Sequence, residues 1–98
     1  MTENPESDPA RAVFGMAVAA ELVGLDPQSL RLYERRGLIH PHRTPGGTRR
    51  YSPDDLERLR RIKALLAAGL NLAGIVMVLA LEADNHDLRA QVMDEDRD

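Results

Sequence analysis

The chain has 98 residues, of which 43% are hydrophobic and 30% are charged, with one Phe, two Tyr and no Trp. This length allows one small module and excludes multi-domain enzyme architectures, and the shortage of aromatic side chains argues against an enclosed substrate pocket. The absence of Cys excludes disulfides and thiolate metal sites, and no apolar run is long enough to span a membrane. We therefore expect a cytoplasmic protein without a cofactor.

The net charge of −3 is unevenly distributed along the chain. Residues 1–10 carry net −3, residues 11–63 hold eleven basic and six acidic side chains, and residues 64–98 hold two basic and seven acidic side chains. The middle of the chain is therefore net +5 between acidic ends. Because binding responds to the local field of a surface, this basic middle can bind a polyanion despite the overall charge.

The first predicted element is a helix that follows a polar N-terminal segment. Residues 1–12 are acidic and contain Pro, so we expect a disordered leader. A helix over residues 17–23 then ends at Gly24. Its inward face is predicted to hold the apolar residues Met16, Ala19, Ala20, Leu22 and Val23.

A second helix begins after a very short connection. Asp26 is suited to the N-cap and Pro27 to the first helical position, and the helix is predicted to run to about Arg36 and to close at Gly37. Only three or four residues separate the two helices. This spacing is typical of a helix-turn-helix.

Residues 38–51 are too interrupted by Pro and Gly for a helix and predict a short hairpin. The chain is expected to turn at Pro45-Gly46-Gly47. Pro41 restricts its strand to the edge of a sheet, because proline cannot donate a backbone hydrogen bond.

Two further helices are predicted from the same kind of start signal. Ser52-Pro53-Asp54-Asp55 indicates a capping box, followed by inward Leu56, Leu59, Ile62 and Leu66 and a C-terminal Gly69. Asn71 caps a fourth helix, whose first turns are expected to direct Leu72, Ile75, Val76 and Leu79 inward.

A second apolar stripe continues along the fourth helix. Its spacing of 3, 4, 3 and 4 residues is that of a coiled-coil seam and involves Val78, Leu81, Asn85, Leu88 and Val92. We therefore expect residues 71–93 to form a dimerisation helix and residues 94–98 a disordered acidic tail.

The second helix has a polar face suited to DNA. Gln28, Arg31, Leu32 and Arg35 share this face, whereas Leu30, Tyr33 and Gly37 are predicted to lie against the domain. Gln can pair with adenine, Arg with guanine, and an apolar side chain can contact a thymine methyl in the major groove. The alternative for any single Arg is an ordinary solvated position, but the set after a helix-turn-helix favours DNA.

The hairpin is a candidate wing for the same DNA. Its cationic and hydroxyl side chains can contact phosphates beside a tip of two glycines, and these are Arg43, Thr44, Thr48, Arg49 and Arg50. An ordinary exposed hairpin is the alternative, disfavoured because no acid occurs between positions 35 and 53. Tyr51 is expected to anchor the wing to the core, and Tyr33 to be a core residue whose hydroxyl reaches a phosphate.

Enzyme and metal-binding interpretations find little support. His40 and His42 could share a metal, but no third ligand is close in sequence, and His86 has no ligand spacing to either. No Ser is paired with a His in a familiar catalytic order. We therefore expect neither a catalytic site nor a metal site.

The order of these motifs resembles the MerR family of transcriptional regulators, over roughly residues 13–81. The segments that carry the resemblance are Ser29-Leu30-Arg31-Leu32-Tyr33-Glu34-Arg35, Gly37-Leu38-Ile39, Arg43-Thr44-Pro45-Gly46-Gly47-Thr48-Arg49-Arg50-Tyr51-Ser52 and Asp55-Leu56. Within that family, the heat-shock repressor (HspR) type is the most similar. The segments that carry this likeness are Val18-Ala19-Ala20-Glu21-Leu22, Pro27-Gln28, Gly46-Gly47-Thr48-Arg49-Arg50-Tyr51-Ser52 and Asn71-Leu72-Ala73-Gly74-Ile75.

The resemblance implies a winged helix-turn-helix that dimerises through an antiparallel coiled coil and binds an inverted repeat in a promoter. It implies DNA contacts at Arg31, Tyr33 and Arg49, a supporting role for Tyr51, and, by analogy, the chaperone DnaK as a co-repressor. The sequence departs from the family at Leu32, where many members have a second Tyr, and at Ala17, where a polar N-cap is usual. The cysteines of metal-sensing members are absent, and the chain ends within the expected dimer helix.

We therefore predict a mainly α protein: a winged helix-turn-helix over residues 13–70 with a β-hairpin wing and a C-terminal dimerisation helix. The predicted function is a DNA-binding repressor that acts as a homodimer on double-stranded DNA, without a membrane or small-molecule effector. An excisionase-like architectural factor and a protein-interaction adaptor are the alternatives. The predicted DNA-binding residues are Gln28, Ser29, Arg31, Tyr33, Arg35, Arg43, Thr48, Arg49 and Arg50.

Overall fold

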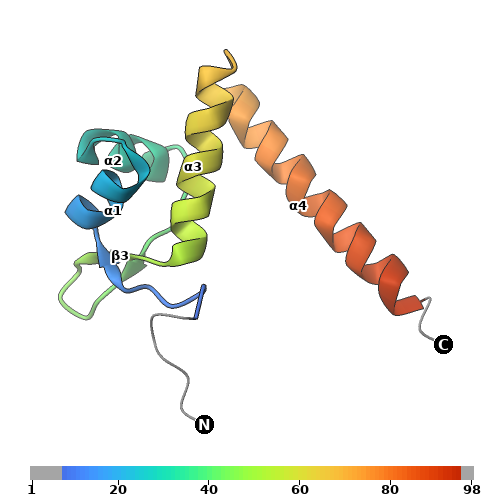
Figure 1. The fold of residues 1–98 in the computed structure, drawn as a ribbon, viewed down its shortest axis with the longest axis horizontal. Helices are drawn as coiled ribbons and strands as arrows, with labels where there is room; N and C mark the ends of the chain where they lie inside the picture. The colour runs from blue at the N-terminus through green and yellow to red at the C-terminus, as the bar shows by residue number, and fades with distance from the viewer. Residues whose placement is uncertain (1–7, 96–98) are drawn as a thin grey trace, which may run out of the picture. The chain divides into compact units, whose positions relative to one another are not determined.

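The computed structural model describes the backbone of residues 8–95 and the side chains of residues 8–85. Its elements are β1 (Phe14–Gly15), α1 (Met16–Val23), α2 (Pro27–Arg35), β2 (His42–Arg43), β3 (Arg49–Tyr51), α3 (Pro53–Ala67) and α4 (Leu72–Glu95) (Figure 1). The chain divides into two compact units between Ala64 and Leu65. The predicted mainly α fold, with a helix-turn-helix and a hairpin, is confirmed.

Glycines define both ends of α1. Gly15 is the N-cap, in extended backbone and without a side-chain cap, and Gly24 closes the helix at φ 71°. The predicted helix start at Ala17 is therefore one residue late, because α1 begins at Met16 and Ala17 lies within the helix rather than at its N-cap. Lys63 from α3 donates from Nζ to the carbonyl oxygens of Val23 and Gly24, at 3.2 and 3.3 Å. A cation at this position complements the negative end of the helix dipole.

The inward face of α1 is narrower than predicted. Ala19, Ala20 and Val23 are buried. Leu22 is 49% exposed, so its predicted inward position is wrong, and Val18 is exposed to the same extent. Two of the three buried residues are alanines, which let α1 pack closely on its neighbours, while Val18 and Leu22 point to solvent.

The local signals that predicted α2 are present in the structure. The carboxylate of Asp26 accepts a 2.9 Å hydrogen bond from the backbone N–H of Ser29. Leu30 and Tyr33 are buried, at 0% and 4% exposure, and attach α2 to the core. Gly37 follows the helix with φ 74° and is exposed, so the prediction that it lies against the domain is wrong.

The hairpin belongs to a three-stranded antiparallel sheet with the order β1-β3-β2. Phe14 pairs with Tyr51, and Arg43 pairs with Arg49. The sequence analysis missed β1, which has only two residues. As predicted, the strand that follows Pro41 lies at an edge, and the turn contains Gly47 at φ 86°.

The predicted capping box starts α3. The Oγ of Ser52 accepts a 3.0 Å bond from the N–H of Asp55, and a carboxylate oxygen of Asp55 accepts a 2.9 Å bond from the N–H of Ser52. The buried residues of α3 are Leu56, Leu59, Ile62 and Leu65. The sequence analysis placed Leu66 instead of Leu65 in this set, and Leu66 is half-buried.

The described end of the predicted leader, residues 8–12, is attached to α3. The N–H of Asp54 donates to the carbonyl oxygen of Pro9 at 2.9 Å. The N–H of Val13 donates to the carbonyl oxygen of Tyr51 at 3.1 Å, directly before β1. The predicted disorder of residues 1–7 and of 96–98 lies outside the described residues.

In the second unit, Asn71 caps α4 as predicted, because its side chain accepts a 2.8 Å bond from the N–H of Gly74. Ile75 and Leu79 are buried, whereas Val76 is 42% exposed, so its predicted inward position is wrong. No helix in the part of the chain that the structure describes is long and apolar enough to cross a membrane.

Candidate nucleic-acid interface

The polar face of α2 points to solvent. Gln28, Arg31 and Arg35 are exposed, and Leu32 beside them is half-buried. Because Leu30 and Tyr33 attach the opposite side of the helix to the core, the orientation of the exposed face is fixed by packing. This is the geometry required of a helix that reads base edges.

Two of the predicted contact residues on α2 are less accessible. Tyr33 is 4% exposed, so its ring belongs to the core, as predicted, and little of it reaches the surface. Ser29 is half-buried, and its backbone N–H is bonded to the N-cap residue Asp26. Both residues therefore have structural roles in the helix itself.

The wing, residues 42–51, presents different side chains on its two faces. Arg43 and Arg49 are directly opposite each other on β2 and β3, and both bond to the same residue of α2. Arg50 lies on the other face, because successive strand residues alternate. Its guanidinium lies over Gly15 of β1, where a Cβ would be only 3.2 Å from Nη1. Thr48, at the tip, is exposed.

The residue of α2 that binds both arginines is Glu34. Its Oε1 accepts a 2.6 Å bond from Nε of Arg49, and its Oε2 accepts a 2.9 Å bond from Nη2 of Arg43. The side chain of Glu34 is 22% exposed, against 28% for Arg49 and 46% for Arg43. The wing therefore does have an acidic partner. The sequence analysis did not find it, because it considered only the acids between positions 35 and 53.

Glu34 could have been found from helical spacing. It follows Leu30 by four residues and therefore lies on the side of α2 that faces the domain. Partial burial raises the pKa of its carboxyl, but the hydrogen bonds and charges of Arg49 and Arg43 outweigh this effect and lower the pKa below its usual 4.5. Glu34 is therefore ionised at neutral pH.

Tyr51 anchors the wing to the core, as predicted, with 0% of its surface exposed. Its hydroxyl is buried without a hydrogen-bond partner among the described residues. Burial raises the pKa of this hydroxyl above its usual 10.0. The anchor therefore depends on packing of the ring rather than on a hydrogen bond.

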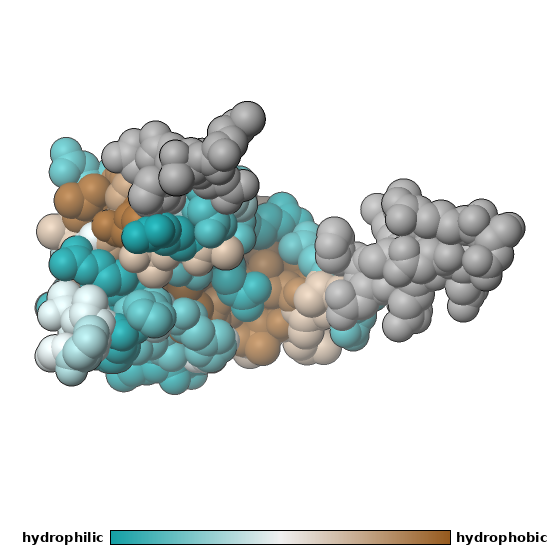
Figure 2. Space-filling model, turned by 90° about the horizontal axis from the view of Figure 1, so that it is seen from below, coloured by the Kyte–Doolittle hydropathy of each residue, from teal (hydrophilic) through white to brown (hydrophobic). Residues whose placement is uncertain are grey.

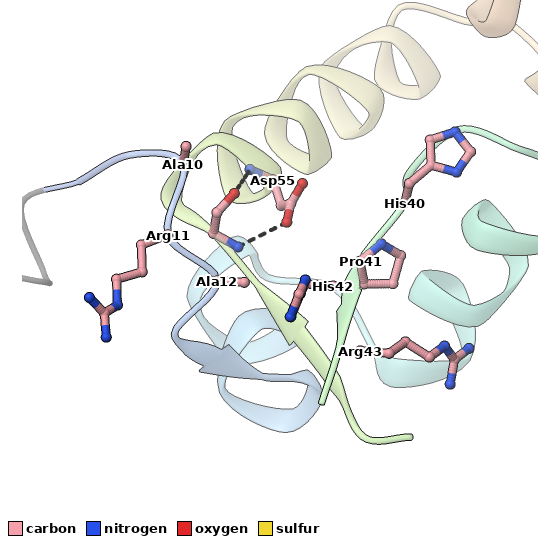
Figure 3. Close-up of a pocket in the computed structure, with 9 residues that line it drawn as sticks. Ala10, Arg11, Ala12, His40, Pro41, His42, Arg43 and Asp55 are labelled. Carbon is pink, nitrogen blue, oxygen red and sulfur yellow. Dashed lines mark hydrogen bonds between the residues drawn. The ribbon is translucent and has the colours of Figure 1, made fainter. Parts of the chain in front are cut away.

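A hollow lies beside the wing, on the side of the N-terminal segment (Figure 3). His40 and His42 line it together with Arg11, and the carboxylate of Asp55 at its wall is already bonded to Ser52. Within the described residues, no three His, Cys, Asp or Glu side chains are grouped to hold a metal ion. The side chain of Arg43 points from the hollow toward α2, consistent with its bond to Glu34.

The surface seen from below Figure 1 is mainly hydrophilic, with smaller hydrophobic areas between the polar side chains (Figure 2). On α4, the exposed apolar residues include Met77 and Leu81, at 66% and 62%. Of the predicted seam, Val78 is half-buried and Asn85 is exposed, while the side chains of Leu88 and Val92 lie outside the described residues. Met77, one turn before Leu81, was not part of the predicted seam.

Comparison with known proteins identifies relatives along most of the chain. The model of MerR HTH family regulatory proteins matches residues 14–82. A Streptomyces coelicolor protein assigned as the heat shock protein HspR is 48% identical over 80 residues, which cover 81% of this chain and 53% of that protein. The transcriptional regulator GlnR of Bacillus anthracis is 35% identical over 98 residues, which cover 100% of this chain and 73% of that protein.

A solved structure supports the same assignment. The N-terminal part of MtaN, the multidrug transporter activator of Bacillus subtilis, matches with a TM-score of 0.65 and 30% identity, covering 85% of this chain and 90% of that one. The present chain spans about half the length of its HspR relative. The chain belongs to the MerR family of helix-turn-helix regulatory proteins, whose members are DNA-binding transcriptional regulators rather than enzymes.

Proposed function

We propose that this MerR-family protein is a repressor that binds an inverted repeat in promoter DNA as a homodimer, within the cytoplasm. The observation that carries the proposal is the exposed face of α2, with Gln28, Arg31 and Arg35 on a helix fixed to the core by Leu30 and Tyr33. In this proposal α2 is the recognition helix and lies in the major groove.

The wing is proposed to lie on the sugar-phosphate backbone beside the recognition helix. Arg43 and Arg49 lie on its helix-facing side, Thr48 is exposed at its tip, and Arg50 extends the basic surface from the other face. Contacts from these residues to phosphates position the protein, whereas Gln28 and Arg31 supply sequence discrimination. Ser29, Tyr33 and Arg35 complete the proposed contact set.

A second copy of the chain is needed because one module contacts only a few base pairs. The proposed dimer helix is α4, on which the exposed Met77 and Leu81 lie on the opposite side of the helix from buried Ile75 and Leu79. Leu81, which is 62% exposed, is the most exposed apolar residue of the predicted seam among the described side chains. The seam proposed from the sequence continues through Leu88 and Val92.

Selection of duplexes from a random-sequence pool with the purified protein tests the proposal. We expect enrichment of an inverted repeat whose half-sites are separated by about one helical turn or a multiple of it. Enrichment of single half-sites would contradict the dimer. Recovery of sequences that share no common motif would contradict specific DNA binding. A reporter placed behind the selected sequence should be repressed in cells, and activation would contradict the repressor role.

Regulation by another protein, rather than by a small molecule, is proposed from the likeness to the HspR type. The candidate is the chaperone DnaK, acting as a co-repressor. Added DnaK should tighten binding of the protein to the selected duplex in a gel-shift titration. An unchanged dissociation constant would remove DnaK from the proposal, and a metabolite that alters the constant would contradict the absence of a small-molecule effector.

A further inference from the structure

One carboxylate connects the recognition helix to both strands of the wing. Arg43 and Arg49 are cross-strand partners, so their guanidinium groups approach α2 side by side. Glu34 uses a different oxygen for each of them, at 2.9 and 2.6 Å. A pair of charge-assisted hydrogen bonds, which are stronger than neutral ones, therefore joins the recognition helix to the wing.

The connection extends to the tip of the wing through Arg43. Its Nη1 donates a 3.0 Å bond to the carbonyl oxygen of Gly47 while its Nη2 is bonded to Glu34. The tip is closed further by Thr44, whose N–H donates to the carbonyl oxygen of Thr48 at 2.9 Å and whose Oγ accepts from the N–H of Thr48 at 3.2 Å. A single guanidinium thus holds both the tip and the helix.

The same arrangement reduces the attraction of the wing for any polyanion. Arg43 and Arg49 carry two positive charges, and the ionised Glu34 between them cancels one. Free arginines attract phosphates regardless of base sequence, and this attraction supplies most of the non-specific affinity of DNA-binding proteins. An arginine held by Glu34 contacts a phosphate only where the duplex follows the geometry that the recognition helix and wing define together.

We propose that Glu34 is a positioning residue that sets DNA specificity: it holds Arg43 and Arg49 in register with the recognition helix and lowers affinity for unrelated DNA. The inference rests on the proposed function, since it assumes that α2 and the wing bind one duplex. It predicts that loss of Glu34 raises affinity for unrelated DNA more than affinity for the selected duplex, so that the ratio of the two affinities falls. A residue that only stabilised the fold would affect both kinds alike.

The test compares Glu34→Gln with the parent on two probes, a duplex selected by the parent from a random pool and a shuffled duplex of the same composition. Affinity for the shuffled duplex should rise by up to about eightfold per protomer at 0.1 M salt, with a slope of log K against log salt steeper by about 0.9. The ratio of selected to shuffled affinity should fall by roughly two- to tenfold, the factor for ordering one long side chain at an interface.

Two further variants act as controls. Glu21→Gln removes the same charge from an exposed position on α1 and should leave the affinity ratio at the parent value. Glu34→Asp keeps the charge on a side chain shorter by one carbon, and its ratio should lie between those of Glu34→Gln and the parent. If Glu34→Gln fails to fold, the ratio of selected to shuffled affinity is measured for Glu34→Asp instead. A ratio below that of the parent supports the role of Glu34, and an unchanged ratio overturns it.

The outcomes separate this inference from the proposed function. A parent that selects no sequence would contradict the function itself. A parent that discriminates between the probes, combined with a Glu34 variant whose ratio is unchanged or higher, would overturn the role of Glu34 alone. A parallel fall of both affinities would also overturn it, because that result identifies a residue needed only for folding.

Discussion

Removal of the Tyr51 hydroxyl should stabilise the protein, although tyrosine-to-phenylalanine changes in a core usually destabilise. The ring of Tyr51 is fully buried, and its oxygen has no hydrogen-bond partner among the described residues. Burying an unpaired hydroxyl costs about 1–3 kcal/mol. Tyr51→Phe keeps the ring contacts, removes this cost and leaves a gap of one oxygen atom. We therefore expect a net gain of about 1 kcal/mol.

Urea denaturation at neutral pH measures this gain, and thermal unfolding should show a midpoint higher by about 4–8 °C.

The dependence of stability on pH provides a second check. Because the folded-state pKa of Tyr51 lies above the unfolded value of 10.0, its protonation stabilises the fold at lower pH, and this contribution is lost as pH rises above 10. Alkaline destabilisation should therefore be weaker in Tyr51→Phe. A variant less stable than the parent by about 1 kcal/mol would refute the reasoning and show that the hydroxyl has a partner, such as a bound water.

Three other predictions follow from the contacts described above. Ser52→Ala and Asp55→Ala should each reduce the free energy of unfolding by about 1 kcal/mol. The double variant should lose less than the sum of the two, because the two bonds of the capping box are reciprocal. Additive losses in urea denaturation would contradict the capping box. The lowered pKa of Glu34 implies a stabilisation of the fold that is complete above pH 4.5 and is lost as pH falls through the folded-state pKa. Acid titration should therefore destabilise the parent more than Glu34→Gln. Identical acid unfolding curves for the two proteins would contradict the pairing of Glu34 with the arginines. Leu81→Asp should place a charge in the proposed seam and abolish dimerisation in sedimentation while residues 13–70 keep their fold; an unchanged dimer would mean that the interface lies elsewhere.

Local signals explain why the helices could be predicted from the sequence. Asp26, Ser52 and Asn71 each satisfy backbone N–H groups within three residues, so their effect depends on chain-local geometry alone. Gly24 and Gly37 end their helices at positive φ for the same reason. The helix-turn-helix and the hairpin then follow from the short connections between these signals.

Other features depend on tertiary structure and left weak traces in the sequence. Strand β1 has two residues and exists because β3 supplies its partner. Leu22 lies next to the buried Val23 but is itself exposed, while Ala19 and Ala20 are buried, so apolar character alone did not identify the buried face of α1.

The candidate site was predicted in part. The exposed face with Gln28, Arg31 and Arg35 follows from helical periodicity once the helix is located. The connection of Arg43 and Arg49 to Glu34 spans nine and fifteen residues of sequence and requires the fold to bring the strands to α2. An inventory of acids within the hairpin could not detect it.

The central claim is that the outward face of α2 reads bases, and Arg31 tests it most directly. The measurement is selection from the same random pool with Arg31→Ala, compared with the parent and with Arg49→Ala. We expect the motif of Arg31→Ala to lose base preference at one position in each half-site, corresponding to about 1–3 kcal/mol, while Arg49→Ala keeps the full motif and binds all sequences more weakly. An unchanged motif with Arg31→Ala would contradict the claim that this face of α2 reads the DNA sequence.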